Sequence, residues 1–312
     1  MRILVTGGAG FIGSHTVDAL VAAGTHQVAV IDDLSAGKRD QVNSGAHFYQ
    51  ADIRDASEIG RIMARERPDV MVHFAAQMDV RRSVADPAFD AQVNLVGFLN
   101  LMEAGRQSGL RRVVFSSTGG AIYGEQDTFP ADETHPCRPV SPYGVAKFST
   151  ESYLFFYQAQ YGIDYAAMRY ANVYGPRQDP HGEAGVVAIF CGRLLEDKPV
   201  TIFGDGEQTR DYVYVGDVVR ANVAAVTSTV TGAINIGTGI ETNVNQLYAI
   251  LAKAAGSNRP PGYAPARPGE QKRSVFAAGR AGRELRWRPE VTIEEGLRRT
   301  YRFFEERFAK GV

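Results

Sequence analysis

A short apolar run followed at once by a cluster of glycines opens the chain and constrains its fold more than any other stretch. Residues 2–6 are Arg-Ile-Leu-Val-Thr, as expected of a strand buried on both faces, and glycines follow at positions 7, 8, 10 and 13. Residues 14–23 then have helical character, and Gly24 ends the helix. A strand, a glycine turn and a helix in this order are the context that a dinucleotide-binding turn requires.

The spacing of these glycines suits a phosphate ligand. They let the backbone come close to a pyrophosphate and let the helix pack tightly on the strand. The helix N-terminus offers free N–H groups and the positive end of the helix dipole. We therefore expect the cofactor to contact Gly7, Gly10, Phe11, Ile12 and Gly13. A plain tight turn between strand and helix is the alternative.

The next predicted strand, residues 27–31, ends in Asp32 and Asp33. A carboxylate at the end of this strand, about twenty residues after the glycines, suits the two ribose hydroxyls of adenosine. It would repel a 2′-phosphate, so NAD is favoured over NADP, and Leu34 is expected at the same site. Lys38 and Arg39 follow a few residues later and keep NADP as the alternative.

Strand and helix patterns alternate as far as Tyr170. Strands are predicted at 47–51, 69–73 and 112–115, and helices at 57–67, 87–108 and 143–161. This alternation predicts an α/β protein, a Rossmann-type doubly wound parallel sheet with a smaller C-terminal substrate-binding domain. The ends of the strands add further candidate cofactor residues: Asp52, Ile53, Phe74, Ala75 and Ala76.

Two groups of residues point to proton-transfer chemistry. Ser116, Ser117 and Thr118 follow the strand at 112–115, at the edge of the sheet where ligands of such folds bind. Tyr143 and Lys147 lie four residues apart on a predicted helix, so their side chains point the same way. The ammonium can lower the pKa of the phenol and make it a proton acceptor for a hydroxyl. Turn-forming hydroxyls and an ordinary surface pair are the alternatives.

The regular alternation breaks after Tyr170. Helices are predicted at 186–195, 218–226 and 293–308, and strands at 200–203 and 232–236. We expect a Rossmann domain of residues 1–170 plus 211–252 and a substrate-binding domain of residues 171–210 plus 253–312. Arg210 and Arg267 lie in loops of this second half and are candidates for binding a second diphosphate, that of a nucleotide substrate.

Composition excludes several classes of function. The net charge is −1 and the basic residues are scattered, so neither nucleic acid nor an anionic membrane is an expected partner. Cys137 and Cys191 lie far apart and the six histidines have no metal spacing, so reduced thiols and no metal are expected. Neither a signal peptide nor a membrane span is predicted. These features are typical of a cytoplasmic protein.

The predicted helix at 143–161 carries more aromatic residues than one face of a sheet needs. A homodimer contact and a thick core are the two interpretations of this excess.

Seven motifs, in order, resemble those of the extended short-chain dehydrogenase/reductases. They extend from the first residue to about Trp287 and are Thr6 to Gly13, Asp32, His73 to Ala76, Phe115 to Thr118, Tyr143 with Lys147, Arg169 to Pro176, and Arg210 to Val215. Within this superfamily the chain looks most like nucleotide-sugar epimerases of the UDP-glucose 4-epimerase type. The resemblance implies a bound NAD, a UDP-sugar substrate and isomerase activity, and the second domain would bind the nucleotide sugar.

The same resemblance implies roles for individual residues. Tyr143 would accept the proton of the sugar 4-hydroxyl, Lys147 would hold the nicotinamide ribose, and either Thr118 or Ser117 would bond O4. Further cofactor contacts would be Asn94, Ser116 and Tyr170. The substrate contacts would be Asn172, Val187, Thr201, Phe203, Arg210, Arg267, Glu270 and Ser274.

The implied reaction inverts C4 of UDP-glucose or UDP-galactose through a transient 4-keto sugar. The cofactor takes the hydride from C4 and returns it on the other face. Related dehydratases carry an Asp-Glu pair after the catalytic threonine, where this chain has Gly119 and Gly120, so epimerisation is favoured over elimination.

The choice of sugar stays open at this point. Ser274 stands where epimerases strict for UDP-glucose tend to carry a tyrosine, so UDP-N-acetylglucosamine and UDP-glucuronate are alternative substrates. A net oxidoreductase and a catalytically silent NAD-binding regulator are the alternative functions. The intact Thr118, Tyr143 and Lys147 argue against the silent regulator.

Overall fold

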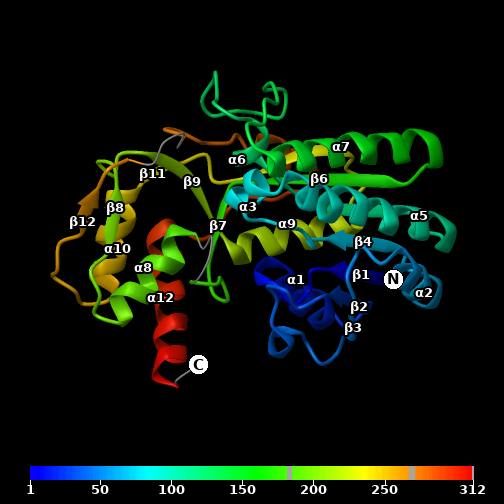
Figure 1. The fold of residues 1–312 in the computed structure, drawn as a ribbon, viewed down its shortest axis with the longest axis horizontal. Helices are drawn as coiled ribbons and strands as arrows, with labels where there is room; N and C mark the ends of the chain where they lie inside the picture. The colour runs from blue at the N-terminus through cyan, green and yellow to red at the C-terminus, as the bar shows by residue number, and fades with distance from the viewer. Residues whose placement is uncertain (181–184, 267–270, 311–312) are drawn as a thin grey trace.

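The fold is that of a computed structural model, which describes residues 1–180, 185–266 and 271–310. Its main feature is a seven-stranded sheet in which every pairing is parallel (Figure 1). From one edge to the other the strands are β10 (Gly232–Ile236), β6 (Asp164–Tyr170), β5 (Arg112–Thr118), β4 (Val70–His73), β1 (Arg2–Thr6), β2 (Gln27–Asp32) and β3 (His47–Gln50). The order reverses direction at β1, which confirms the predicted doubly wound sheet.

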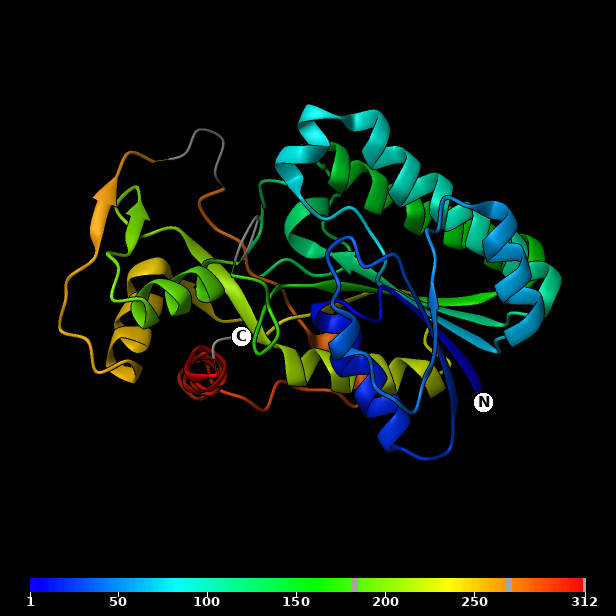
Figure 2. The same ribbon diagram turned by 60° about the horizontal axis from the view of Figure 1, so that its bottom comes forward.

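Helices cover both faces of this sheet, as Figure 2 shows. On one face α1 (Phe11–Ala22) packs against α9 (Val215–Thr227), and on the other α2 (Ala56–Glu66) packs against α5 (Phe98–Ser108) beside α7 (Pro142–Tyr161). Side chains of successive strand residues alternate between the two layers: Ile3 and Val5 belong to the core under α1 and α9, and Leu4 to the core under α2 and α5. Burial on both faces accounts for the continuous apolar runs of the sequence.

Helix α7 begins where local sequence signals place its start. Ser141 is the N-cap, its hydroxyl accepts a hydrogen bond from the N–H of Gly144 at 3.1 Å, and Pro142 occupies the first turn. Gly162, with φ of 69°, ends the helix in the left-handed region. Tyr143 therefore lies in the first turn of a helix with well-defined ends.

The segment predicted as one helix at 87–108 is helical throughout but not uniform. It consists of α4 (Pro87–Ala91), one π-helical stretch η2 (Gln92–Gly97) and α5, and it is preceded by α3 (Val80–Ala85), which periodicity did not predict. Strand β5 also extends to Thr118, so Ser116, Ser117 and Thr118 belong to the strand itself rather than to the turn after it. A short helix, α6 (Gly119–Ile122), follows directly.

A smaller part of the molecule lies beyond one end of the sheet (Figure 1). It contains a three-stranded sheet of β7 (Asn172–Tyr174), β9 (Thr209–Tyr214) and β11 (Glu241–Asn243), and the pair β8 (Thr201–Phe203) and β12 (Gly262–Ala264). Helices α8 (Val186–Leu195), α10 (Val244–Ala254) and α12 (Ile293–Ala309) enclose its own hydrophobic core.

The chain passes between the two parts several times. Helix α10 shares the core of α8 and α12, although the expected boundary at residue 252 assigned it to the Rossmann domain. After β12 the chain returns to the large sheet, where α11 (Gly279–Glu284) contacts β10 and Trp287 donates its indole N–H to the carbonyl of Asp217 at 2.8 Å. It then crosses back to form α12. We propose that the boundary in this region falls before α10.

Candidate active site

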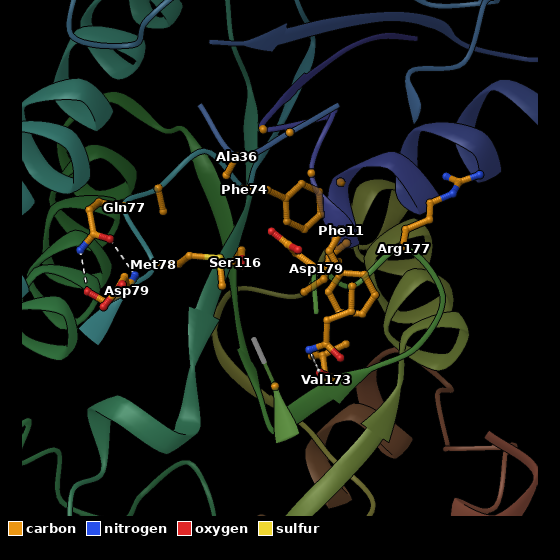
Figure 3. A pocket seen from close by; sticks show the side chains of 18 of the residues that line it. Phe11, Ala36, Phe74, Gln77, Met78, Asp79, Ser116, Val173, Arg177 and Asp179 are labelled. Carbon is orange, nitrogen blue, oxygen red and sulfur yellow. Dashed lines mark hydrogen bonds between the residues drawn. The ribbon is translucent and has the colours of Figure 1, made fainter. Parts of the chain in front are cut away.

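A cavity of about 1910 Å³ lies at the carboxyl ends of the large sheet's strands and continues into the smaller part of the molecule (Figure 3). Its lining includes the glycine turn, the ends of β2, β4 and β5, the start of α7, and the segment after β6. This is the edge at which doubly wound sheets bind ligands.

The glycine turn has the shape that a dinucleotide phosphate needs. Gly7 has φ of 68°, and a Cβ atom there would lie 2.6 Å from the backbone nitrogen of Ala75. A Cβ at Gly13 would lie 2.1 Å from the carbonyl oxygen of Gly7. Gly10 is the N-cap of α1 and provides no side-chain bond to the first turn, whose N–H groups are left for a ligand. These residues fit the pyrophosphate of a dinucleotide.

Asp32 ends β2 in the wall of the same cavity and is 7% exposed. One carboxylate oxygen accepts the N–H of Ala9 and the other the N–H of Leu34, both at 2.9 Å. Burial raises the pKa of this carboxyl, and the two backbone hydrogen bonds oppose the rise. Each oxygen keeps lone-pair capacity for a ribose hydroxyl. The arrangement fits the adenosine ribose of NAD.

The proton-transfer residues come together on β5 and α7. Lys147 is 3% exposed, and its ammonium donates a hydrogen bond to the backbone carbonyl of Ser116 at 2.8 Å. The same nitrogen lies 5.8 Å from the ring centre of Tyr143. A Cβ at Gly144 would lie 2.5 Å from the carbonyl oxygen of Ala121, so this glycine lets the first turn of α7 approach the segment after Thr118. Tyr143, Lys147, Ser116 and Thr118 all line the cavity.

Burial dominates the acid–base properties of this pair. It lowers the pKa of Lys147 to about 8, with a smaller opposing effect of the Asp90 carboxylate. It raises the pKa of Tyr143, and the charge of Asp90 raises it further. The lowering of the Tyr143 pKa expected from Lys147 does not overcome these two effects, because a phenolate loses much solvation in such a site.

Ser117 and Thr118 point to opposite sides of β5, because side chains alternate along a strand. The Ser117 hydroxyl donates to Glu151 at 2.6 Å, on the buried side. Thr118 caps α6, and its hydroxyl accepts the N–H of Ala121 at 3.3 Å. Both residues line the cavity, but the Ser117 hydroxyl is already bonded to Glu151, so we propose Thr118 as the hydroxyl that bonds a ligand beside Tyr143.

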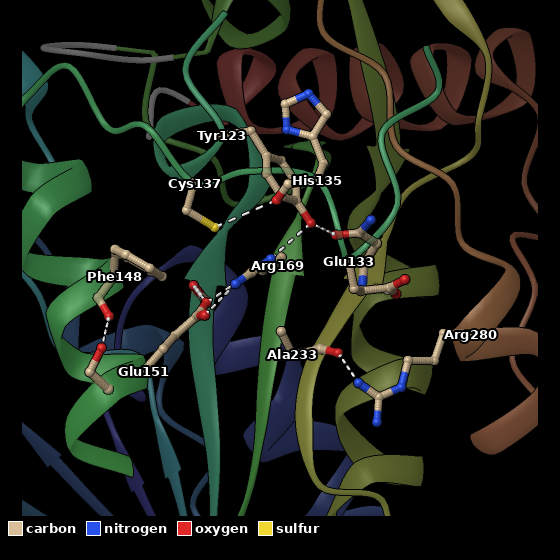
Figure 4. A network of polar contacts seen from close by, with 12 residues as sticks. Tyr123, Glu133, His135, Cys137, Phe148, Glu151, Arg169, Ala233 and Arg280 are labelled. Atoms are coloured by element: carbon tan, nitrogen blue, oxygen red, sulfur yellow. Dashed lines mark hydrogen bonds and ion pairs between the residues drawn. The ribbon is translucent and has the colours of Figure 1, made fainter. Parts of the chain in front are cut away.

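Behind Ser117 lies a buried polar network, drawn in Figure 4. Arg169 on β6 binds both carboxylate oxygens of Glu151 on α7, at 3.0 and 2.6 Å. Its third nitrogen donates to the Tyr123 hydroxyl at 3.0 Å, which in turn donates to Asn235 at 2.7 Å. The network ties the site-bearing helix to three strands of the sheet.

Most of the predicted site residues line this single cavity. In addition to those described above, they are Phe11, Ile12, Asp33, Asp52, Ile53, Phe74, Ala75, Ala76, Tyr170, Asn172 and Arg210. Six others lie outside its lining: Leu34, Asn94, Val187, Thr201, Phe203 and Ser274. Val187 and Ser274 are fully buried, Val187 in the core of the smaller part. Arg267 and Glu270 lie outside the residues that the structure describes.

Several cavity residues were not predicted. Gln77 follows β4 and forms hydrogen bonds with Asp79 in the cavity wall (Figure 3). Arg177, beyond β7, also lines the cavity and pairs with Asp18 of α1 at 2.8 Å. Asp90 is a buried carboxylate close behind this wall. Asn94, four residues later, lies on the same buried helical face, and this spacing of two polar residues was the sequence signal that could have drawn attention to Asp90. Among the described residues, no group of three or more His, Cys, Asp or Glu side chains could hold a metal ion.

Fold and cavity together define the class of this protein, a dinucleotide-binding α/β protein with a Tyr–Lys pair at the cofactor edge. The chain belongs to the NAD-dependent epimerase/dehydratase family, whose model matches residues 3–237. This membership confirms the resemblance drawn from the seven motifs.

Three relatives illustrate the similarity. A UDP-glucose 4-epimerase of Mycolicibacterium smegmatis is 47% identical over 98% of this chain and 99% of its own length. The crystal structure of the Thermotoga maritima UDP-glucose 4-epimerase with UDP-glucose superposes with a TM-score of 0.96 at 50% identity, covering 99% and 100% of the two chains. The Thermus thermophilus UDP-glucose 4-epimerase, in complex with NAD, has a TM-score of 0.92 at 48% identity, covering 97% and 99%.

Proposed function

We propose that this protein is an NAD-dependent isomerase that inverts C4 of a UDP-hexose, with UDP-glucose and UDP-galactose as its substrates. The observation that carries the proposal is one cavity lined by the glycine turn, by Asp32, by Thr118 with Tyr143 and Lys147, and by Asn172 with Arg210. The three relatives described above are UDP-glucose 4-epimerases, and each is similar to this chain over nearly its whole length.

Each residue has a part in the reaction that its chemistry supports. A bound NAD would supply the hydride acceptor and donor for C4 and, in its oxidised form, a positive charge in the site. Tyr143 accepts the proton of the 4-hydroxyl and later gives it back. Lys147 supplies a buried ammonium beside the phenol, and Thr118 forms a hydrogen bond with the sugar O4. Arg210 binds the diphosphate. The glycine turn and Asp32 hold the cofactor.

Epimerisation is favoured over elimination because the positions after Thr118 carry no acid or base. A Cβ at Gly119 would lie 2.7 Å from the ring of Phe276, whereas Gly120 lines the cavity without a side chain. A carboxylate that could remove the C5 proton or expel water is therefore missing from this pair of residues.

Incubation with UDP-galactose and no added NAD tests the function. We expect UDP-glucose to accumulate until both sugars are at equilibrium, because the cofactor is regenerated in every cycle. A second incubation, with NAD added in excess, tests for an oxidoreductase, which would release NADH in proportion to the substrate. No conversion of any UDP-sugar in either incubation would show a silent NAD-binding protein. Parallel reactions with UDP-N-acetylglucosamine and UDP-glucuronate test the alternative substrates. The space that the small side chain of Ser274 was expected to leave is not part of the cavity, because Ser274 is fully buried outside its lining.

A homodimer through the outer face of α7 and η2 is the second part of the proposal. Exposed apolar side chains gather on these neighbouring segments: Val96, Val145, Tyr153, Phe155, Phe156 and Tyr161. An apolar patch of this kind on a soluble protein usually marks an interface.

The two free cysteines, Cys137 and Cys191, support a cytoplasmic location. No helix in the described parts of the chain is both long and apolar enough to cross a membrane.

Phe155→Glu should convert the dimer to a monomer, because Phe155 is 63% exposed on this face and a buried carboxylate would be unpaired. The molar mass in solution, measured by light scattering after size exclusion, checks the result. Ile240→Glu is the control, since Ile240 is 64% exposed but lies away from α7, next to β11. A dimeric Phe155→Glu variant would refute the proposed interface.

A further inference from the structure

A buried carboxylate lies behind the wall of the active-site cavity and has no part in the reaction as described so far. Asp90, on α4, is 1% exposed. One of its oxygens accepts two hydrogen bonds at 3.0 Å, from the side-chain amides of Gln77 and Asn94. Burying a carboxylate is costly unless it is paired or hydrogen-bonded, so a fold keeps one in such a place for a reason.

The partners of Asp90 hold it in a fixed position. Asn94 exchanges two hydrogen bonds with the backbone of Gln77, each at 2.9 Å, and Gln77 lines the cavity. Asn94 lies in the π-helical stretch η2, an irregularity that in many proteins occurs at functional sites. The wall of the cavity, the π-helical stretch and the carboxylate therefore form one hydrogen-bonded unit.

This unit lies against the helix that carries the reacting groups. Helix α4 and η2 both pack on α7, and the Thr150 hydroxyl of α7 donates to the carbonyl of Asn94 at 3.4 Å. The charge of Asp90 acts on Lys147 and on Tyr143, both of which lie on α7. Burial raises the pKa of Asp90 itself, and the hydrogen bonds from Gln77 and Asn94, together with the charge of Lys147, oppose that rise. From β4, His73 faces Lys147, and it is neutral because burial lowers its pKa to about 3.

We propose that Asp90 is a positioning residue of the proton-transfer site, a fixed counter-charge that keeps Lys147 in its ammonium form beside Tyr143. The inference rests on the proposed epimerase function and adds a residue to it. Lys147 is anchored by the Ser116 carbonyl, which cannot neutralise its charge. A buried lysine with no carboxylate nearby tends to lose its proton near neutral pH.

The sign of the effect on pH dependence follows from the charges. The negative charge of Asp90 raises the pKa of Lys147 against the lowering by burial, and it also raises the pKa of Tyr143. When that charge is removed, both values fall. Two limbs of the profile of rate against pH then move to lower pH together. One reports loss of the Lys147 proton, and the other reports formation of the Tyr143 phenolate.

Asp90→Asn tests the proposal, because asparagine keeps the shape and an acceptor oxygen for Gln77 and Asn94. We expect the whole profile of kcat against pH to move to lower pH by about one unit, the size of a shift caused by one nearby charge. Asp86→Asn is the matched control: it removes an exposed carboxylate four residues earlier on the chain and keeps a good helix cap. Its profile should coincide with that of the wild type.

A second readout does not depend on turnover. In protein with isotopically labelled lysine side chains, the Lys147 resonance is assigned through Lys147→Arg and titrated in the wild type and in Asp90→Asn. A lower titration midpoint in the variant supports the proposal, and an unchanged midpoint or an unshifted rate profile overturns it. If Asp90→Asn does not fold, the same two measurements are made on Asp90→Thr. Conversion of UDP-galactose by the wild type alone decides the proposed function, so the two failures are distinguishable.

Discussion

Tyr143→Phe lowers the rate of sugar conversion by about 10²–10⁴-fold, the usual contribution of a positioned proton acceptor. Phenylalanine fills the same space but cannot take the proton of the 4-hydroxyl. Lys147 keeps its bond to the Ser116 carbonyl, and the glycine turn is unchanged, so NAD should remain bound. The measurement is kcat with UDP-galactose, together with the amount of cofactor released when the purified variant is denatured.

Tyr153→Phe is the control for this variant. Tyr153 lies on the same helix but outside the cavity lining, on the face proposed for the dimer contact, so loss of its hydroxyl should leave kcat within about twofold. Unchanged turnover in Tyr143→Phe would remove Tyr143 from the reaction. Loss of bound cofactor in the same variant would show that the phenol acts in binding rather than in proton transfer.

Glu151→Leu destabilises the protein by about 3–5 kcal/mol, because it leaves the Arg169 guanidinium buried without a counter-charge. The two side chains are 8% and 6% exposed, and the shortest distance between their nitrogen and oxygen atoms is 2.6 Å. The substitution also leaves the Ser117 hydroxyl without its acceptor. The free energy of unfolding, from urea titration at constant pH, measures the loss.

The double variant Glu151→Leu with Arg169→Met removes both charges of the ion pair, so that neither is left buried without a partner. An apolar replacement of a whole buried ion pair is often neutral or stabilising, so most of the loss should be recovered, apart from the hydrogen bonds of Ser117 and Tyr123. Arg138→Met is the control, since the Arg138–Asp127 pair is exposed and an exposed pair contributes about 0–1 kcal/mol. Equal losses in the single and double variants would contradict this account.

The parts of the fold that sequence could predict are those with a local signal. The strand and glycine turn at the start and the helix at 143–161 were predicted, and each is in place. Ser141 before the helix and Gly162 after it are further signals that act within a few residues. The cofactor edge also followed from pattern, because parallel strands bring their carboxyl ends together. Tyr143, Lys147 and Thr118 were predicted to lie near one another on this basis, and they line one cavity.

Other features depend on contacts between distant segments, which periodicity does not report. The π-helical stretch at 92–97 exists where Asn94 bonds the backbone of Gln77, seventeen residues earlier. Side-chain alternation along β5 places Ser117 and Thr118 on opposite sides of the strand. This could not be predicted, because β5 ends three residues beyond its predicted end. The effect of Asp90 on Lys147 is likewise a through-space interaction between two helices. No run of apolar residues could have indicated it.

The repeated passage of the chain between the large sheet and the smaller part has an evolutionary consequence. The chain forms β7 and β9 in the smaller part, α9 and β10 in the larger, α10 and β12 in the smaller, α11 in the larger and α12 in the smaller. No single cut therefore separates two pieces that each hold a complete core. Recombination therefore cannot replace the smaller part as one continuous segment, as it can for domains that follow one another along a chain. New sugar preferences in such a chain have to arise by residue changes and loop insertions on a framework inherited whole.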